Sequence, residues 1–211
     1  MKKVKFIVFI CLFILLPLAY FNGFIRISDL TSEQESIAKK YGGVYVFDEK
    51  LEKEIDKREE ERDKYLDDFF KNNNRDFDLN DQAIMNEKLP RVLSNGKKYY
   101  VTTRDYGNDF KKKAEVPEIY LNKIIEFIGK DYDIYTPNVT LKYFYADNSG
   151  NIVPVKTIAT YIYEITTFGI SGDEASGIKF SSSNLAAAKG GNRFEFINNK
   201  FEKISNQSKD K

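Results

Sequence analysis

An unbroken uncharged stretch, Phe6–Ile25, constrains this chain more than any other feature of its sequence. Twenty residues rise about 30 Å as a helix, which is the thickness of the hydrocarbon core of a bilayer. Lys2, Lys3 and Lys5 precede the stretch, and a basic flank stays on the cytoplasmic side of a membrane. The sequence therefore predicts a membrane helix at residues 1–25, which sends the rest of the chain outward across the cytoplasmic membrane.

A cleaved signal peptide is the alternative interpretation of this segment. The apolar part of a signal peptide is about 7–15 residues long and ends at a site of small residues. Here the apolar run Phe6–Phe21 is longer, and Tyr20–Asn22 at its end are poor substitutes for small residues. We therefore favour an uncleaved single-pass anchor over secretion after cleavage.

The composition of the remaining chain is that of an ordinary folded domain. Hydrophobic residues make up 42% of the 211 residues, which is enough to build a core. Three of the 33 basic side chains precede the apolar run, so 30 basic and 32 acidic side chains belong to the exported part. A chain so close to neutral gives no indication of nucleic-acid binding. We expect attachment to the membrane through residues 6–25 and no nucleic-acid partner, and the composition sets no oligomeric state.

The absence of histidine and the presence of only one cysteine exclude several classes of catalytic and metal site. The chain has no histidine, which excludes Ser-His-Asp and Cys-His catalysis and histidine-ligated zinc. Its single cysteine is Cys11, inside the apolar run, so it can form neither an internal disulfide nor a thiolate cluster. We expect no cofactor and no metal, and an exported part that is stabilised by burial alone.

A short helix is expected soon after the membrane segment. Thr31 and Ser32 are suitable N-caps, and Glu35, three residues after Ser32, completes a capping box. Gly42-Gly43 ends the helix. Residues 26–43 are therefore predicted to be a short helix with a linker.

A long amphipathic helix is expected after Asp48, which is a good N-cap. Every residue between Ile55 and Tyr65 is charged. Such a surface is either an acidic docking face or a helix surface in contact with water, and we favour the second. A further amphipathic helix is predicted from Pro117 to Gly129.

The last third of the chain is rich in strand signals. Val139, Leu141, Tyr143 and Tyr145 alternate with other residues, which predicts a strand with these four side chains on one face. The return run, Ile152–Phe168, is long for one strand, so a bend near Pro154 or a bulge is expected. Two further β segments are expected at 178–183 and, as a final hairpin, at 193–204.

Helices followed by antiparallel strands predict an α+β fold, in which an N-terminal membrane helix precedes helices packed on one face of a C-terminal antiparallel β-meander. A curved sheet that cradles a helix resembles cystatin-like and NTF2-like rolls, a layout that membrane-anchored assembly factors of bacterial secretion systems can share. The predicted division of the chain is a membrane helix at 1–25, a short helix and linker at 26–43, an extracytoplasmic domain at 44–205 and a polar tail at 206–211.

The glycine-rich segment Gly169–Gly177 has the composition of a possible active-site loop. Its first five residues lack the final glycine of the G-x-S-x-G nucleophile elbow, because residue 173 is aspartate. No histidine is available to activate Ser171. The sequence therefore predicts a mobile connector between two strands, with no catalytic residue.

Four side chains are candidates for contact with a partner. Asp173 and Glu174 are adjacent, so on an extended chain they point to opposite faces and do not form a catalytic carboxylate pair. Tyr161 and Tyr163 lie in the preceding strand and could add aromatic surface. We expect Asp173, Glu174, Tyr161 and Tyr163 to contact a protein rather than a substrate.

The hypothesis that best fits these features is a membrane-anchored, extracytoplasmic protein-binding domain without enzymatic activity. An envelope-assembly subunit and a periplasmic immunity protein both fit it. The alternatives are a carboxylate-dependent hydrolase of the bacterial envelope, and a domain that binds a small ligand or a lipid.

Overall fold

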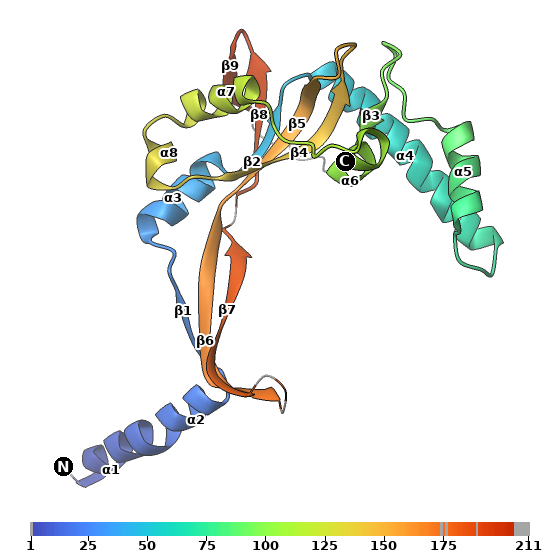
Figure 1. Cartoon of the computed structure of the whole chain (residues 1–211). Coiled ribbons are helices and arrows are strands. Elements are labelled where there is room, and N and C mark those ends of the chain that lie inside the picture. The colour runs from blue at the N-terminus through green and yellow to red at the C-terminus, as the bar shows by residue number, and fades with distance from the viewer. Residues whose placement is uncertain (1, 174, 176, 189, 205–211) are drawn as a thin grey trace, which may run out of the picture.

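The computed structural model describes residues 2–173, 175, 177–188 and 190–204. These residues form three consecutive parts: an apolar N-terminal helix, a three-stranded stalk, and a head in which helices surround a six-stranded sheet (Figure 1). The stalk lies between the other two parts, so it sets the distance between the helix and the head.

The N-terminal helix comprises α1 (Lys2–Ile10), a π-helical turn (Cys11–Leu15) and α2 (Leu16–Phe21). The π-turn comes just before Pro17, which lacks an N–H and whose ring clashes with the preceding turn of a regular α-helix. Lys3–Phe21 is a stretch of 19 residues that is long and apolar enough to cross a membrane. This agrees with the predicted membrane helix, although length and composition alone also suit a signal sequence.

The stalk consists of β1 (Ile25–Ser28), β6 (Ile162–Asp173) and β7 (Gly177–Ala187), in the order β1-β6-β7. Both pairs are antiparallel. Only three residues separate the end of α2 from the start of β1, so the apolar helix leads directly into the stalk.

The head sheet has the strand order β3-β4-β5-β2-β8-β9. Its strands are β2 (Gly43–Val46), β3 (Tyr99–Tyr100), β4 (Asn138–Ala146), β5 (Ile152–Thr160), β8 (Asn192–Ile197) and β9 (Lys200–Ile204). Neighbours are antiparallel except for β2 and β8, which are parallel. The predicted α+β class is confirmed. The sheet is not a C-terminal meander, because β2 enters its middle from the N-terminal part of the chain.

The head helices are α3 (Ser32–Tyr41), α4 (Glu49–Asn72), α5 (Leu79–Lys88), α6 (Thr103–Phe110), α7 (Glu118–Ile128) and α8 (Asp131–Ile134). α4 begins after Asp48, as predicted, and α7 ends before Gly129. At α3 the capping box joins Thr31 and Gln34, rather than Ser32 and Glu35.

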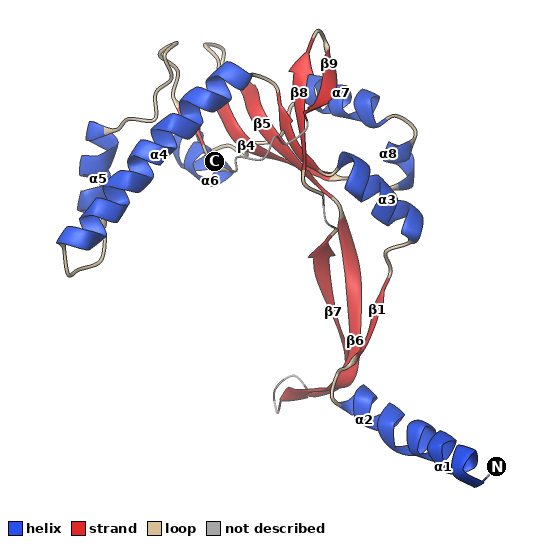
Figure 2. Ribbon diagram, turned by 180° about the vertical axis from the view of Figure 1, so that it is seen from behind, coloured by secondary structure: helices blue, strands red, loops and turns tan. Residues whose placement is uncertain are grey.

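The helices cover both faces of the head sheet, as the two opposite views in Figures 1 and 2 show for α7 and α4. On one face, Tyr45 of β2 and Phe194 of β8 pack with Ile124 of α7 in a core that also includes α3. On the other face, Ile55 of α4 packs on Val155 of β5. The expectation of helices on one sheet face is wrong, because helices pack on both faces and divide the core into two layers.

One expectation about the C-terminal strands is confirmed and another is wrong. A bulge is present in the return run, as expected, because the register of β4 with β5 shifts between Lys156 and Pro154. The run is also divided between two sheets, since β5 ends at Thr160 and β6 begins at Ile162. The segment Gly169–Gly177 is not a connector between strands along its whole length, since β6 continues to Asp173 and β7 starts at Gly177. The glycine-rich residues therefore form the end of a long antiparallel ribbon.

Candidate functional site

The four residues expected to contact a partner do not form one site. Tyr161 is 1% exposed and packs in the head core, next to the ring of Tyr135, so its expected role at the surface is corrected. Tyr163 lies half-buried in the stalk. Asp173 ends β6, and the extended chain between Tyr161 and Asp173 spans roughly 40 Å at about 3.3 Å per residue. Glu174 lies outside the described residues.

The outer edge of β7 is a better candidate for an interaction site. β7 pairs with β6 along one edge, and its other edge pairs with no strand in the described part of the chain. Its residues are exposed at nearly every position. Natural edge strands usually carry charges, prolines or bulges that prevent further pairing. From Phe180 to Ala188 this strand and its extension carry no charge and no proline.

The faces of the stalk are also open. Ile27 of β1 lies in register with Thr166 of β6, which is itself opposite Ser183 of β7. Leu185 is two residues beyond Ser183, so it lies on the same face as Ile27, and both side chains are exposed. A three-stranded sheet ordinarily needs an apolar face buried against something else for independent stability. The described stalk buries little apolar surface of its own, so a partner that covers this face would stabilise it.

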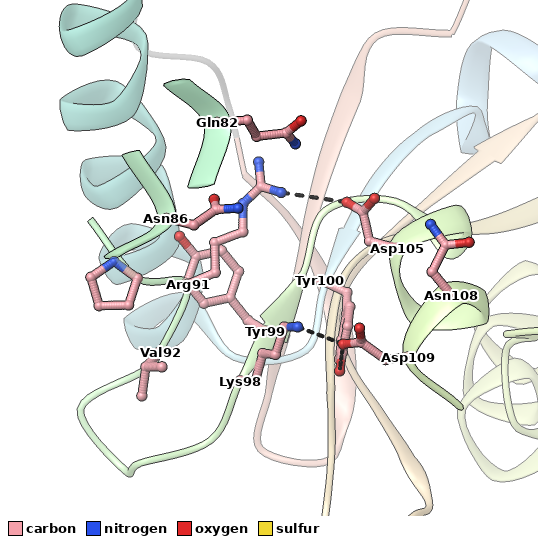
Figure 3. A pocket seen from close by; sticks show the side chains of 11 residues that line it. Gln82, Asn86, Arg91, Val92, Lys98, Tyr99, Tyr100, Asp105, Asn108 and Asp109 are labelled. Carbon is pink, nitrogen blue, oxygen red and sulfur yellow. Dashed lines mark hydrogen bonds and ion pairs between the residues drawn. The ribbon is translucent and has the colours of Figure 1, made fainter. Parts of the chain in front are cut away.

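A polar cavity of about 330 Å³ lies in the head, between α5, α6 and the segment that leads into β3 (Figure 3). Asn86 of α5 contributes to one wall, and Arg91 and Lys98 come from the segment before β3. Asp105 and Asp109 of α6 form the opposite side, and Figure 3 shows Arg91 directed to Asp105 and Lys98 to Asp109.

The charged groups of the cavity are paired. Arg91 donates to both carboxylate oxygens of Glu59, at 2.8 and 2.9 Å, and lies 3.4 Å from Asp105. The Tyr99 hydroxyl donates to Glu59 at 2.7 Å. Burial by itself raises the pKa of Glu59, but Arg91 and Tyr99 outweigh it and hold that pKa below its usual range. Lys98 likewise lowers the pKa of Asp109. These acids therefore stay ionised near neutral pH, which suits recognition of polar groups better than proton transfer.

A second ion-pair network joins α4 to the sheet. Glu52 is 1% exposed, and its two carboxylate oxygens accept from Arg193 of β8, at 3.0 and 2.5 Å. Lys156 of β5 adds a third contact at 2.8 Å. Burial raises the pKa of Glu52, but the two cations outweigh it and lower the pKa below its ordinary value. The network connects the helix to two strands that are distant in the sequence.

Sequence reasoning missed both networks because the charged stretch of α4 was expected to be solvated. Glu52, Ile55, Glu59 and Arg62 are three or four residues apart, so they share one helix face. Glu52, Ile55 and Arg62 are buried, and Arg62 donates to the backbone carbonyl of Leu89. The spacing is the signal that could have shown that charges continue the buried face begun by Ile55.

Among the residues that the structure describes, no three acidic, histidine or cysteine side chains come together in a way that could hold a metal ion. Comparisons with protein-family models, with curated proteins and with solved structures found no match for this chain. The function is therefore argued from the stalk and the head themselves.

Proposed function

We propose that this chain is a single-pass, membrane-anchored binding protein of the bacterial envelope, without enzymatic activity, and that a strand of a partner protein pairs with the outer edge of β7. The N-terminal helix anchors the chain with its basic end in the cytoplasm. The head lies outside the membrane, at the height that the stalk sets. Within this proposal an envelope-assembly subunit is the best-supported role, because a stalk between anchor and head suits a fixed position in an assembly.

The open edge of β7 is the observation that carries the proposal. An edge strand presents a row of backbone N–H and C=O groups, and an extended segment of another protein can satisfy them by β-augmentation. Ser181, Ser182, Ser183 and Asn184 along this edge are small and uncharged, so they leave room for a neighbouring strand. Their exposure on both faces indicates that the described part of the chain does not complete this sheet.

The arrangement of charges in the head supports a role without catalysis. Glu59 and Asp109, beside the cavity, are ionised and paired with Arg91 and Lys98, and the sequence contains no histidine to exchange protons near pH 7. The cavity can serve as a polar recognition surface for the same partner.

Photo-crosslinking in the native membrane tests the proposal. A photoreactive residue at Asn184, on β7, is expected to give an adduct with another protein. The matched control is the same residue at Ser149, which lies in the exposed turn between β4 and β5 and is expected to give none.

Two neighbouring proline variants make the test specific for the strand edge. Backbone N–H groups of successive residues point to opposite edges of a strand, so one of Ser182→Pro and Ser183→Pro removes an outward N–H and the other breaks the ladder with β6. The outward variant is expected to lose the adduct at Asn184 while the head unfolds at an unchanged temperature. Full crosslinking in both proline variants would contradict pairing at this edge.

A further inference from the structure

The end of the β6–β7 ribbon has one apolar face. Gly172 lies opposite Ile178, and side chains alternate between the faces of a strand, so Ile170, Ile178 and Phe180 share one side of the ribbon. These three side chains are 52%, 74% and 59% exposed. Ser171 and Lys179 face each other on the opposite side. The ribbon end is therefore amphipathic, with three large apolar groups directed away from its polar side.

A shift of register brings Ile170 to this face. The pairing of β6 with β7 slips between Phe168 and Ser171, as it does at a β-bulge. Before the slip, Phe168 lies opposite Ser181, on the side of Lys179. After the slip, Ile170 lies on the side of Ile178 and Phe180. Figure 1 shows that the ribbon turns away from the axis of the stalk at its end.

The same ribbon end is attached to the last turn of the apolar helix. The Tyr20 hydroxyl donates to the Phe180 carbonyl at 3.5 Å, and the rings of Tyr20 and Phe168 are 6.2 Å apart. A β-carbon added at Gly169 would lie 3.2 Å from the backbone of Gly23, so the two segments touch closely. The position of the ribbon end therefore follows the position of the end of the helix.

We propose that the apolar face of the ribbon end, formed by Ile170, Ile178 and Phe180, lies in the outer interface of the lipid bilayer. This rests on the membrane anchor of the proposed function. When Lys3–Phe21 spans the bilayer, Tyr20 lies at the depth where aromatic residues are enriched, and the ribbon end lies next to it. Lys179, on the polar side, then faces the headgroups and water.

A lipid surface fits this patch better than a second protein does. Stable protein interfaces bury about 800 Å² on each partner, which is much more than three side chains provide. The patch also lies on the part of the ribbon that contacts the end of the apolar helix, whereas the open edge of β7 proposed for the protein partner lies further along the strand. The ribbon would thus be a second membrane contact beside the anchor, and the two contacts together would hold the stalk at a defined angle to the membrane.

Tryptophan fluorescence tests the inference without background emission from other tryptophans, because the natural chain contains none. Full-length Phe180→Trp is reconstituted in vesicles of phosphatidylcholine and phosphatidylglycerol, with part of the phosphatidylcholine brominated on its acyl chains. Bromine is expected to lower the emission about twofold, because an interfacial apolar face reaches about 5–10 Å into the boundary of headgroups and acyl chains. Ile170→Trp serves as a second reporter on the same face.

Three control variants separate the possible failures. Leu79→Trp, exposed on α5 of the head, is expected to show no quenching, and Lys179→Trp, on the polar side, less than Phe180→Trp. Phe13→Trp reports on the anchor itself and is expected to be strongly quenched. Quenching at Phe13 with none at Phe180 or Ile170 would overturn the inference and leave the anchor intact. Blue-shifted emission at Phe180 that bromine does not quench would also overturn it, in favour of contact with another protein copy.

Discussion

Glu52 places a full negative charge in the interior, between two cations from different strands. Removing one member of a buried ion pair is costly, because the charges that remain lose their compensation. Glu52→Gln keeps the shape of the side chain, and Glu195 still contacts Arg193, at 2.8 Å. We therefore expect a loss of about 3 kcal/mol in the free energy of unfolding, near the lower end of the range for such changes.

Chemical denaturation of the purified chain measures this loss, with Lys53→Gln as the control. Lys53 pairs with Glu49 on an exposed surface of α4, so its replacement is expected to lower the free energy of unfolding by less than about 0.5 kcal/mol. Equal losses in the two variants would contradict the role of Glu52 as the link between α4 and the sheet.

The same carboxylate predicts how stability depends on pH. The pKa of Glu52 is lower in the folded chain than in the unfolded chain, so its contribution is present above the unfolded pKa of about 4.3 and is lost as the pH falls through the folded pKa. Arg75 lowers the pKa of Asp81 to about 2. The stability that this ionised carboxylate contributes is therefore also lost as the pH falls toward that value. Stability is expected to stay level between about pH 5 and 8, because no histidine titrates there.

Denaturation curves at a series of pH values from 7 to 3 check this expectation. The wild type should lose stability below about pH 4, and the difference between wild type and Glu52→Gln should shrink over the same interval. A difference that stays constant down to pH 3 would show that the charge of Glu52 is not what stabilises the fold.

Gly43 is the residue that lets β2 enter the middle of the head sheet. Its φ is +146°, and a β-carbon there would lie 2.1 Å from the Asn192 carbonyl oxygen of β8. Gly43→Ala is expected to cost about 3 kcal/mol or more, from backbone strain and the displacement of β8 together. Gly96→Ala is the control, because its φ is also positive, at +78°, but nothing lies within 4 Å, so about 1 kcal/mol is expected. Thermal or chemical unfolding of both variants decides the point, and similar costs would contradict the close approach of β2 and β8.

At the scale of elements, helices with clear caps and apolar periodicity could be predicted from the sequence. Asp48 and Pro117 marked the starts of two such helices. α5 and α6 were missed, although Asp78 and Thr102 cap them, because α5 is polar with weak periodicity and α6 has only 8 residues and contains Gly107. Their positions depend on contacts such as that of Tyr106 with Tyr100 of β3, which only the folded chain shows.

Strand faces could be predicted only as far as the alternation is regular. Leu141 and Tyr143 were expected on one face, but the pairing of β4 with β5 shifts between them. Leu141 packs with Phe144 on the α6 side, whereas Tyr143 lies in the cluster around Ile55 of α4. A bulge moves one residue across the sheet without leaving a distinctive residue in the sequence, so periodicity alone could not find it.

The openness of β7 predicts uneven protection from hydrogen exchange. In dilute detergent solution without a partner, the outward amides of β7 should exchange quickly, and those of β5, in the middle of the head sheet, should exchange slowly. Amide exchange resolved by residue measures the contrast. Uniform protection along β7 would contradict an edge that is open in the isolated chain. Addition of the partner captured at Asn184 should slow the outward amides selectively.

At the scale of the whole molecule, the topology was beyond the reach of local patterns. β2 pairs with β8 across about 150 residues of sequence, and nothing in residues 43–46 specifies this neighbour. The candidate site was missed for a related reason. Asp173 and Glu174 were chosen because they are charges in a glycine-rich segment. An open strand edge is instead defined by the absence of a pairing strand, and it can be recognised only when the pairing of the whole sheet is known.

The division into stalk and head predicts that the head folds without its anchor. Among the described residues, the three apolar clusters of the head begin at Ile37. Removal of residues 1–29 deletes the apolar helix and β1, and leaves β6 and β7 as a two-stranded ribbon, which is marginally stable in water. The truncated chain is therefore expected to unfold cooperatively, within about 1 kcal/mol of the full-length chain, while exchange of the β6 amides rises sharply. Circular dichroism during chemical denaturation and amide exchange measure the two effects. Loss of the cooperative transition would mean that the stalk contributes to the folding of the head, and a ribbon that stays protected would mean that β1 is dispensable for it.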